Sequence, residues 1–137
     1  MSDRIAVVFD ASAVTAYIEG NVSVGELMLE VADEGRQVAI PATCLAVAFA
    51  SVADEIDAAL LALMMTAPMI RILPLGAEDV RDTGKLARAV DGDISSGHAA
   101  RAALIHEAHY ATAHPKAAAR GLPTNWSILE LARGVPG

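Results

Sequence analysis

An aspartate, Asp10, follows a run of five apolar residues in the segment IAVVFDASAV (residues 5–14), and the hydroxyl of Ser12 comes two positions later. A continuous run rich in Val and Ile is typical of a strand buried on both faces of a parallel sheet. In open parallel sheets, ligands bind in the crevice outside the carboxyl ends of the strands. A carboxylate here is therefore a candidate for catalysis or metal binding. Its alternative role is structural, because the dipole at a helix N-terminus favours a negative charge.

Two further aspartates, Asp91 and Asp93, lie on the turn DGD shortly before Ser96. A glycine-containing turn could bring one of these carboxylates toward Asp10, and a pair of carboxylates would suit a divalent cation. The same composition is common in turns that bind nothing, because Asp and Gly favour turn conformations. Both interpretations remain open, with Asp10 and Asp93 as the hypothetical metal ligands.

The four histidines raise the question of a transition-metal site. His106 and His109, in HEAH, are one residue too close for the helical motif that places two histidines four positions apart. His98 and His114 could flank the pocket above Asp10, where a histidine and a carboxylate together bind transition metals. The alternative is that these histidines make ordinary hydrogen bonds at the ends of helices and strands.

The elements that would position these residues alternate between strand and helix. Apolar, β-prone runs predict strands at residues 5–10, 36–42, 69–75, 109–113 and 125–131. Helical spacing and capping residues predict helices at residues 11–19, 22–35, 42–53, 54–66 and 77–90, then one that ends at Glu107 and a short one after Pro115. Because each crossover between parallel strands needs a helix, this alternation implies a parallel sheet covered on both sides. The predicted fold class is α/β, a three-layer α/β/α sandwich around a mostly parallel sheet of about five strands.

Length and charge limit the possible functions. The 137 residues predict one domain, residues 1–137, with a single core. The net charge of −7 argues against non-specific nucleic-acid binding, which depends on Lys and Arg at phosphates. Arg81, Lys85 and Arg88 have helical spacing and form either one local basic face or simply a solvated helix face.

Composition also predicts where the protein works. The single cysteine, Cys44, cannot form an internal disulfide and fits a reducing compartment. The longest apolar stretch, residues 58–70, contains Pro68 and is too short to span a bilayer. No basic segment precedes an apolar run at the start of the chain, so no signal peptide is expected. The sequence therefore predicts a cytoplasmic protein with no membrane partner.

Three segments share their pattern with one known family: the strand that ends in Asp-x-Ser, the middle segment VAIPATCLAVAF (38–49), and the late segment GHAARAALIHEAHYATAHP (97–115). Together they resemble a PIN domain, the nuclease fold found in toxins of bacterial toxin–antitoxin pairs. This resemblance spans nearly the whole chain. It implies that acidic residues from three or four segments gather at the carboxyl edge of the sheet and hold divalent metal. Such ions clamp both oxygens of an in-line phosphodiester displacement.

Residue by residue, the PIN pattern is only partly retained. Asp10 matches the first acid, and Ser12 matches the hydroxyl that commonly follows it. The second acid, a glutamate in the helix after the second strand, falls on or next to Val47 in CLAVAFA. The resemblance therefore leaves this second ligand position without a carboxylate.

The other two acids of the pattern are also missing. The third, at the start of the late helix, falls on Ser96, and His98 matches the family's histidine. The last falls on His114 of YATAH, while Thr112 matches the family's threonine. Of four expected carboxylates only Asp10 stands in place. Glu107 falls where the family usually turns with glycine, which predicts a solvent-facing position.

The resemblance and the missing acids lead to two hypotheses about function. In the first, the chain is related to toxin endoribonucleases but has a degraded metal site, is weakly active or inactive, and acts by binding RNA, a nucleotide or a protein. It then has no cofactor, or weakly bound Mg²⁺ or Mn²⁺, and its crevice could admit a phosphate through helix N-termini and the hydroxyls of Ser12, Ser95 and Ser96. The alternative is an active Mg²⁺- or Mn²⁺-dependent endoribonuclease toxin that uses Asp10 with Asp93 or Asp91. A Rossmann-like nucleotide binder is disfavoured because FDASAVTA contains no glycine.

Partners follow from the same resemblance. A toxin relative is expected to form a homodimer and to have its groove covered by the helix of an antitoxin-like protein. The apolar residues 60–65, with adjacent Met64 and Met65, could pack in the core or form an interface. We predict the core, because a small domain needs these side chains to fill its interior.

Overall fold

The computed structural model describes residues 4–131, which form a three-layer α/β/α sandwich around a five-stranded sheet. The strand order is β3-β2-β1-β4-β5, and every paired neighbour runs parallel. The strands are β1 (Ile5–Phe9), β2 (Gln37–Pro41), β3 (Ile70–Leu73), β4 (His109–Thr112) and β5 (Ile128–Glu130). The predicted fold class is thus confirmed.

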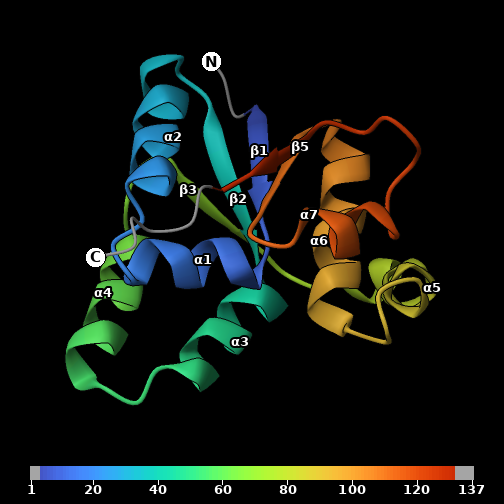
Figure 1. The fold of residues 1–137 in the computed structure, drawn as a ribbon, viewed down its shortest axis with the longest axis horizontal. Helices are drawn as coiled ribbons and strands as arrows, with labels where there is room; N and C mark the ends of the chain where they lie inside the picture. The colour runs from blue at the N-terminus through green and yellow to red at the C-terminus, as the bar shows by residue number, and fades with distance from the viewer. Residues whose placement is uncertain (1–3, 132–137) are drawn as a thin grey trace.

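Helices cover both sides of the sheet, with α2 and α6 flanking it from opposite sides in Figure 1. Their bounds are α1 (Ala11–Ile18), α2 (Val22–Asp33), α3 (Ala42–Ser51), α4 (Glu55–Met65), α5 (Val80–Arg88), α6 (Ile94–His106) and α7 (Pro115–Ala119), with a 3₁₀ turn η1 at Ala77–Asp79. All five residues of β1 are buried, as expected for the central strand of a sheet covered on both faces. Among residues 4–131, no helix is long and apolar enough to cross a membrane.

The chain leaves β1 directly into α1, and β2 directly into α3, at one edge of the sheet. Because all strands run parallel, the carboxyl end of β4 lies at this edge too. Asp10 therefore stands at the carboxyl edge, as its sequence context predicts. Its backbone N–H donates to the carbonyl oxygen of Ala111 at 3.4 Å, which extends the β1–β4 pairing to the start of α1.

The helix α4 only partly fulfils the prediction that residues 60–65 belong to the core. Leu61 and Met64 are buried, but Leu63 is 67% exposed, and Leu60 and Met65 are 40% and 41% exposed. The prediction is wrong for these three residues because α4 is apolar nearly all round, while only one of its faces packs against the rest of the protein. The other face is an exposed apolar surface.

Glu107 follows the last residue of α6 as its C-cap; it is exposed, as predicted, and adopts a left-handed backbone conformation with φ of 51°. Left-handed geometry crowds the Cβ of any residue except glycine. We expect Glu107→Gly to raise the free energy of unfolding by about 1 kcal/mol, measured by urea denaturation. Glu107→Ala keeps the crowded Cβ and serves as the control. An equal gain in both variants would contradict this explanation.

Candidate functional site

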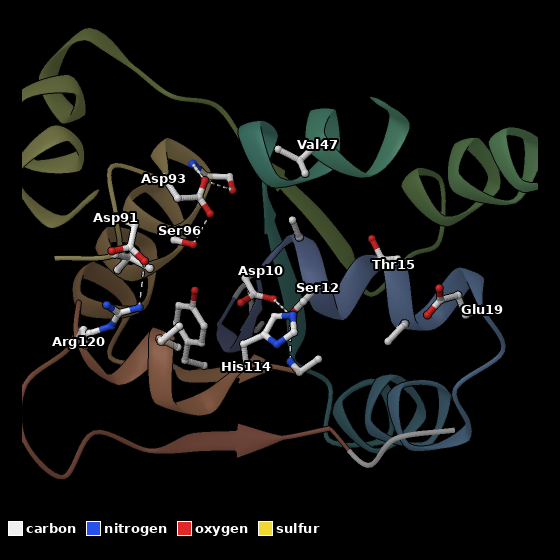
Figure 2. A pocket seen from close by; sticks show the side chains of 18 residues that line it. Asp10, Ser12, Thr15, Glu19, Val47, Asp91, Asp93, Ser96, His114 and Arg120 are labelled. Atoms are coloured by element: carbon white, nitrogen blue, oxygen red, sulfur yellow. Dashed lines mark hydrogen bonds and ion pairs between the residues drawn. The ribbon is translucent and has the colours of Figure 1, made fainter. Parts of the chain in front are cut away.

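A cavity of about 700 Å³ opens at the carboxyl edge of the sheet, where Asp10 lies. Its walls come from α1, from the turn before α6 and from the segment after β4 (Figure 2). Several residues singled out by the sequence line it together: Asp10, Ser12, Asp91, Asp93, Ser96 and His114. The folded chain thus brings both hypothetical metal ligands to one cavity.

Asp10 is only 7% exposed and caps the N-terminus of α1. Its Oδ1 accepts hydrogen bonds from the Ser12 hydroxyl at 2.6 Å and from the Ala13 backbone N–H at 3.0 Å. The capping role considered from the sequence is therefore realised, and the carboxylate is well satisfied within the protein.

Ser12 and Thr112 connect the start of α1 to the end of β4. Their hydroxyl oxygens lie 3.2 Å apart, and the Ser12 oxygen also accepts from the Ala113 N–H at 2.9 Å. The Thr112 hydroxyl accepts from the His114 N–H at 3.0 Å. Thr112 is fully buried and lies behind Ser12, so it supports the cavity wall but does not line the cavity.

Asp93 caps the N-terminus of α6 in the same way. Its Oδ1 accepts from the Ser95 N–H at 3.1 Å and the Ser95 hydroxyl at 2.9 Å, and its Oδ2 accepts from the Ser96 hydroxyl at 2.7 Å. Partial burial raises the pKa of the Asp93 carboxyl, but the hydrogen bonds from Ser96 and Ser95 outweigh it, so the pKa is lowered overall. Asp93 is thus a carboxylate held by three donors of its own helix.

Asp91 does not point its charge toward Asp10. Its Oδ2 lies 3.2 Å from a guanidinium nitrogen of Arg120, and both side chains are exposed. Asp91 has a left-handed backbone conformation with φ of 56°, which agrees with the turn predicted for the segment DGD. The hypothesis that Asp91 replaces a missing ligand is not supported, because its carboxylate pairs with Arg120 at the cavity rim (Figure 2).

Comparison with known proteins identifies the architecture around this cavity. No protein-family model matches the sequence, and no curated protein matches it. The solved structure of VapBC2 from Rickettsia felis, bound to a DNA fragment from its promoter, matches with a TM-score of 0.71 and 14% identity over 93% of this chain and 99% of that chain. The solved structure of FitAB bound to the IR36 DNA fragment matches with a TM-score of 0.64 and 14% identity, over 96% of this chain and 99% of that chain. The chain has a PIN-like fold.

Three residues on or next to which the PIN resemblance places acids line the cavity, and none of them is a carboxylate: Val47, Ser96 and His114. Val47, on α3, is 41% exposed. His114 is the residue before α7, and its imidazole lies beside Asp10 and Ser12 in Figure 2. The cavity therefore has an apolar side chain, a hydroxyl and an imidazole at these three residues.

The structure corrects the expected position of His98. Its Nδ1 lies 2.7 Å from the Thr43 hydroxyl, and the residue lines a separate cavity of about 240 Å³ between α6 and the end of β3. His98 and Ser96 are two positions apart on α6, and residues at that spacing do not share a helix face. With Ser96 at the Asp10 cavity, His98 has to face away from it.

Burial lowers the pKa of His98, opposed by a backbone hydrogen bond to Pro74 and by the charge of Asp79. The neutral ring is favoured in the folded state, so stability is complete above the unfolded pKa of about 6.5 and falls as pH drops through the lower folded pKa. We expect urea denaturation between pH 7 and pH 5 to show this loss, and His98→Gln to reduce it. Asp93 titrates below this range, and His106→Gln is the control for the other histidine with a lowered pKa. An unchanged slope in His98→Gln would contradict the assignment.

The residues of the site do not fit the resident divalent metal that a PIN-like fold implies. No three His, Cys, Asp or Glu side chains within residues 4–131 form a group that could hold a metal ion. Mg²⁺ prefers octahedral oxygen coordination, with one or two carboxylates free to bind it. Asp10 through Oδ1, and Asp93 through both carboxylate oxygens, instead accept hydrogen bonds from the helices that they cap.

The sequence analysis missed Tyr110 as a member of the site. It treated HYATA only as a strand, yet Tyr110 lines the cavity and is 1% exposed. Burial, followed by the charge of Asp10, raises the pKa of the Tyr110 phenol far above its usual value. The available signal was a polar-tipped aromatic within a strand that runs beside the strand of Asp10, since a buried tyrosine hydroxyl usually finds a partner.

Proposed function

We propose that this chain is a PIN-fold relative of toxin endoribonucleases that has a degraded metal site and acts by binding a protein partner. The observation that carries the proposal is the condition of the two cavity carboxylates. Asp10 and Asp93 both cap helices, and no three His, Cys, Asp or Glu side chains of the described residues come together as a metal-binding group. Metal-activated hydrolysis needs an ion with open coordination positions, which this arrangement disfavours.

Charge supports a protein partner over RNA or a nucleotide. The chain carries a net charge of −7, and the cavity is lined by Asp10, Glu19, Asp91 and Asp93. Of the basic side chains there, Arg120 is paired with Asp91. A phosphate entering this cavity would meet more negative than positive charge, and both long helices that start there already have an aspartate at their N-termini.

The exposed apolar face of α4 also supports a protein partner. Ile56 and Leu63 are 71% and 67% exposed, and Leu60 and Met65 lie on the same short helix. Contiguous apolar surface of this kind commonly marks a protein interface. The similar solved structures are toxin–antitoxin complexes, which favours an antitoxin-like partner, and a second copy of the chain is the other occupant that the PIN resemblance implies.

The metal part of the proposal is tested by calorimetric titration of Mn²⁺ into the wild-type protein and into Asp10→Asn. We expect no saturable binding in either protein, because the carboxylates are held by their own helices. A Glu107→Gln variant controls for weak binding at surface acids. Saturable binding that is lost only in Asp10→Asn would contradict the proposal.

The alternative function is an active Mg²⁺- or Mn²⁺-dependent endoribonuclease. One observation favours it: Asp10 and Asp93 line the same cavity. It predicts that Mn²⁺ supports cleavage of a labelled RNA oligomer and that Asp10→Asn abolishes the cleavage. Fluorescence anisotropy with the same oligomer in EDTA separates RNA binding from cleavage, and tight binding there would favour RNA over a protein as the partner.

A further inference from the structure

The strand β5 forms one edge of the sheet, and its outer side has no paired strand. Within the described residues its one paired neighbour is β4. Leu131, directly after the strand, donates its backbone N–H to the Thr112 carbonyl oxygen at 2.9 Å. Because successive residues of a strand direct their backbone groups to opposite sides, the N–H and C=O groups of Ile128 and Glu130 point away from β4. This edge therefore presents backbone donors and acceptors to which another strand can pair.

A groove of about 630 Å³ lies beside this edge, between β5 and α2. Its apolar surface comes from four leucines: Leu27, Leu29, Leu129 and Leu131. Leu29 is 63% exposed, and Leu129 and Leu131 are two positions apart and so face the same side of the sheet. The free strand edge is thus continuous with apolar surface on which the side chains of an added strand can pack.

Acidic side chains line the same groove: Glu26, Glu30, Asp33 and Glu130. The first three have helical spacing and lie along one face of α2. The ion pairs within residues 4–131 involve none of these four acids, and no Lys or Arg of the described chain lines the groove. No three acids of the described residues gather as a metal-binding group, so these charges are spread along the groove. They complement cations spaced along an extended chain.

We propose that the free edge of β5 binds an extended segment of a protein partner that carries Lys or Arg at alternate positions. The segment adds to the sheet through the backbone of Ile128 and Glu130, the mode of recognition by strand addition. The aliphatic stems of its basic side chains cover the leucines, and their charged ends reach the acids of α2. The opposite edge strand, β3, carries the exposed Arg71, which disfavours such a segment there.

This inference deepens the proposed function and rests on its assignment of a protein partner, but not on the condition of the metal site. The test uses the full chain and the fluorescein-labelled peptide KVKVKVK, with binding measured by fluorescence anisotropy. We expect it to bind at least about tenfold more tightly than EVEVEVE, which has the same alternation and the opposite charge. Amide hydrogen exchange should slow at Ile128 and Glu130 when KVKVKVK is bound, because their N–H groups become paired.

Glu130→Pro and Glu130→Ala form a matched pair. Both remove the carboxylate, but only proline removes the N–H that points away from β4, and proline is tolerated at such edge positions. We expect Glu130→Pro to bind KVKVKVK at least about fivefold more weakly than Glu130→Ala, since one backbone hydrogen bond is lost. Circular dichroism and thermal unfolding confirm that both variants are folded. Equal affinities in the two variants, or no saturable binding by wild type, would overturn the inference.

A second pair of variants tests the charge of the groove without altering the strand. We expect Glu30→Lys to weaken binding of KVKVKVK by about tenfold, because it reverses a charge on the face of α2 that lines the groove. Glu107→Lys makes the same change at an exposed residue outside the groove and should change the affinity by less than about twofold. Equal losses in both variants would mean that the peptide responds only to net charge, and the groove would be rejected as its site.

Two other occupants of this edge would each overturn an external partner. A second copy is the occupant if sedimentation shows that wild type self-associates and Glu130→Pro does not. The chain's own residues 132–137, which lie outside the described residues, are the occupant if KVKVKVK binds only after Arg133→Gln. The proposed function is judged separately: Mn²⁺ binding lost in Asp10→Asn would overturn its degraded metal site, and tight RNA binding in EDTA would overturn its protein partner. Failure of KVKVKVK to bind would overturn the assignment of β5 alone.

Discussion

Asp10→Ala is expected to lower the free energy of unfolding by about 2 kcal/mol, measured by urea denaturation followed by circular dichroism. The substitution removes the cap of α1 and leaves the Ala13 N–H and the Ser12 hydroxyl without this acceptor. The Ala13 N–H is buried, so water cannot replace the lost carboxylate there without rearrangement. Loss of the cap bond costs about 1 kcal/mol, and the lost bond from the partly buried Ser12 hydroxyl adds about 1 kcal/mol.

Asp54→Ala provides the matched comparison. Asp54 caps α4 through one hydrogen bond, from the Ile56 N–H to its Oδ1 at 2.6 Å, and the pair is exposed. We expect this substitution to cost about 1 kcal/mol, because water can reach the freed donor. If Asp10→Ala instead stabilised the protein, repulsion between the Asp10 and Asp93 carboxylates would be destabilising the wild type. Asp10 would then be retained for function, as at sites where activity is kept at the expense of stability. That result would favour the endoribonuclease alternative.

The fold could be predicted because its signals are local. Five apolar, β-prone runs separated by helical segments specify a parallel α/β sheet, and each predicted strand appears at its expected place. The predicted strand bounds are less accurate where turn residues lie within a predicted strand. The predicted strand 125–131 is reduced to Ile128–Glu130, since Asn125 adopts a left-handed turn conformation and the Trp126 indole donates to the Ala108 carbonyl.

The site was only partly predictable because it depends on the rotation of helices and on partners far away in sequence. Asp10 could be placed from its strand alone, and its capping role was one of two interpretations. The position of His98 depended on which face of α6 meets the sheet, which an alanine-rich helix does not specify. Tyr110 and Asp10 line one cavity from two neighbouring strands, and only the β1–β4 pairing brings them together.

The geometry at the start of α6 depends in turn on how closely α5 and α6 approach. Gly97 lies within the first turns of α6, directly after Ser96, and is buried. A Cβ added there would lie 2.4 Å from the Thr83 carbonyl oxygen and 2.9 Å from both the Cβ and the backbone nitrogen of Ala87. Two of these atoms belong to the backbone of α5, so no side-chain rotation can relieve the contact.

Gly97→Ala is therefore expected to lower the free energy of unfolding by about 3 kcal/mol, at the upper end of the range for overpacked cores. Gly84→Ala, on α5, has nothing within 4 Å of its added Cβ and should stabilise the protein by about 0.5–1 kcal/mol. Both substitutions gain the same helix propensity and restrict the unfolded chain equally, so their difference isolates the contact between the two helices. Denaturation curves that place Gly97→Ala at or above wild-type stability would mean that α5 can move away from α6. The positions of Asp93 and Ser96 would then be adjustable, and the hydrogen bonds that satisfy Asp93 could open to admit a cation.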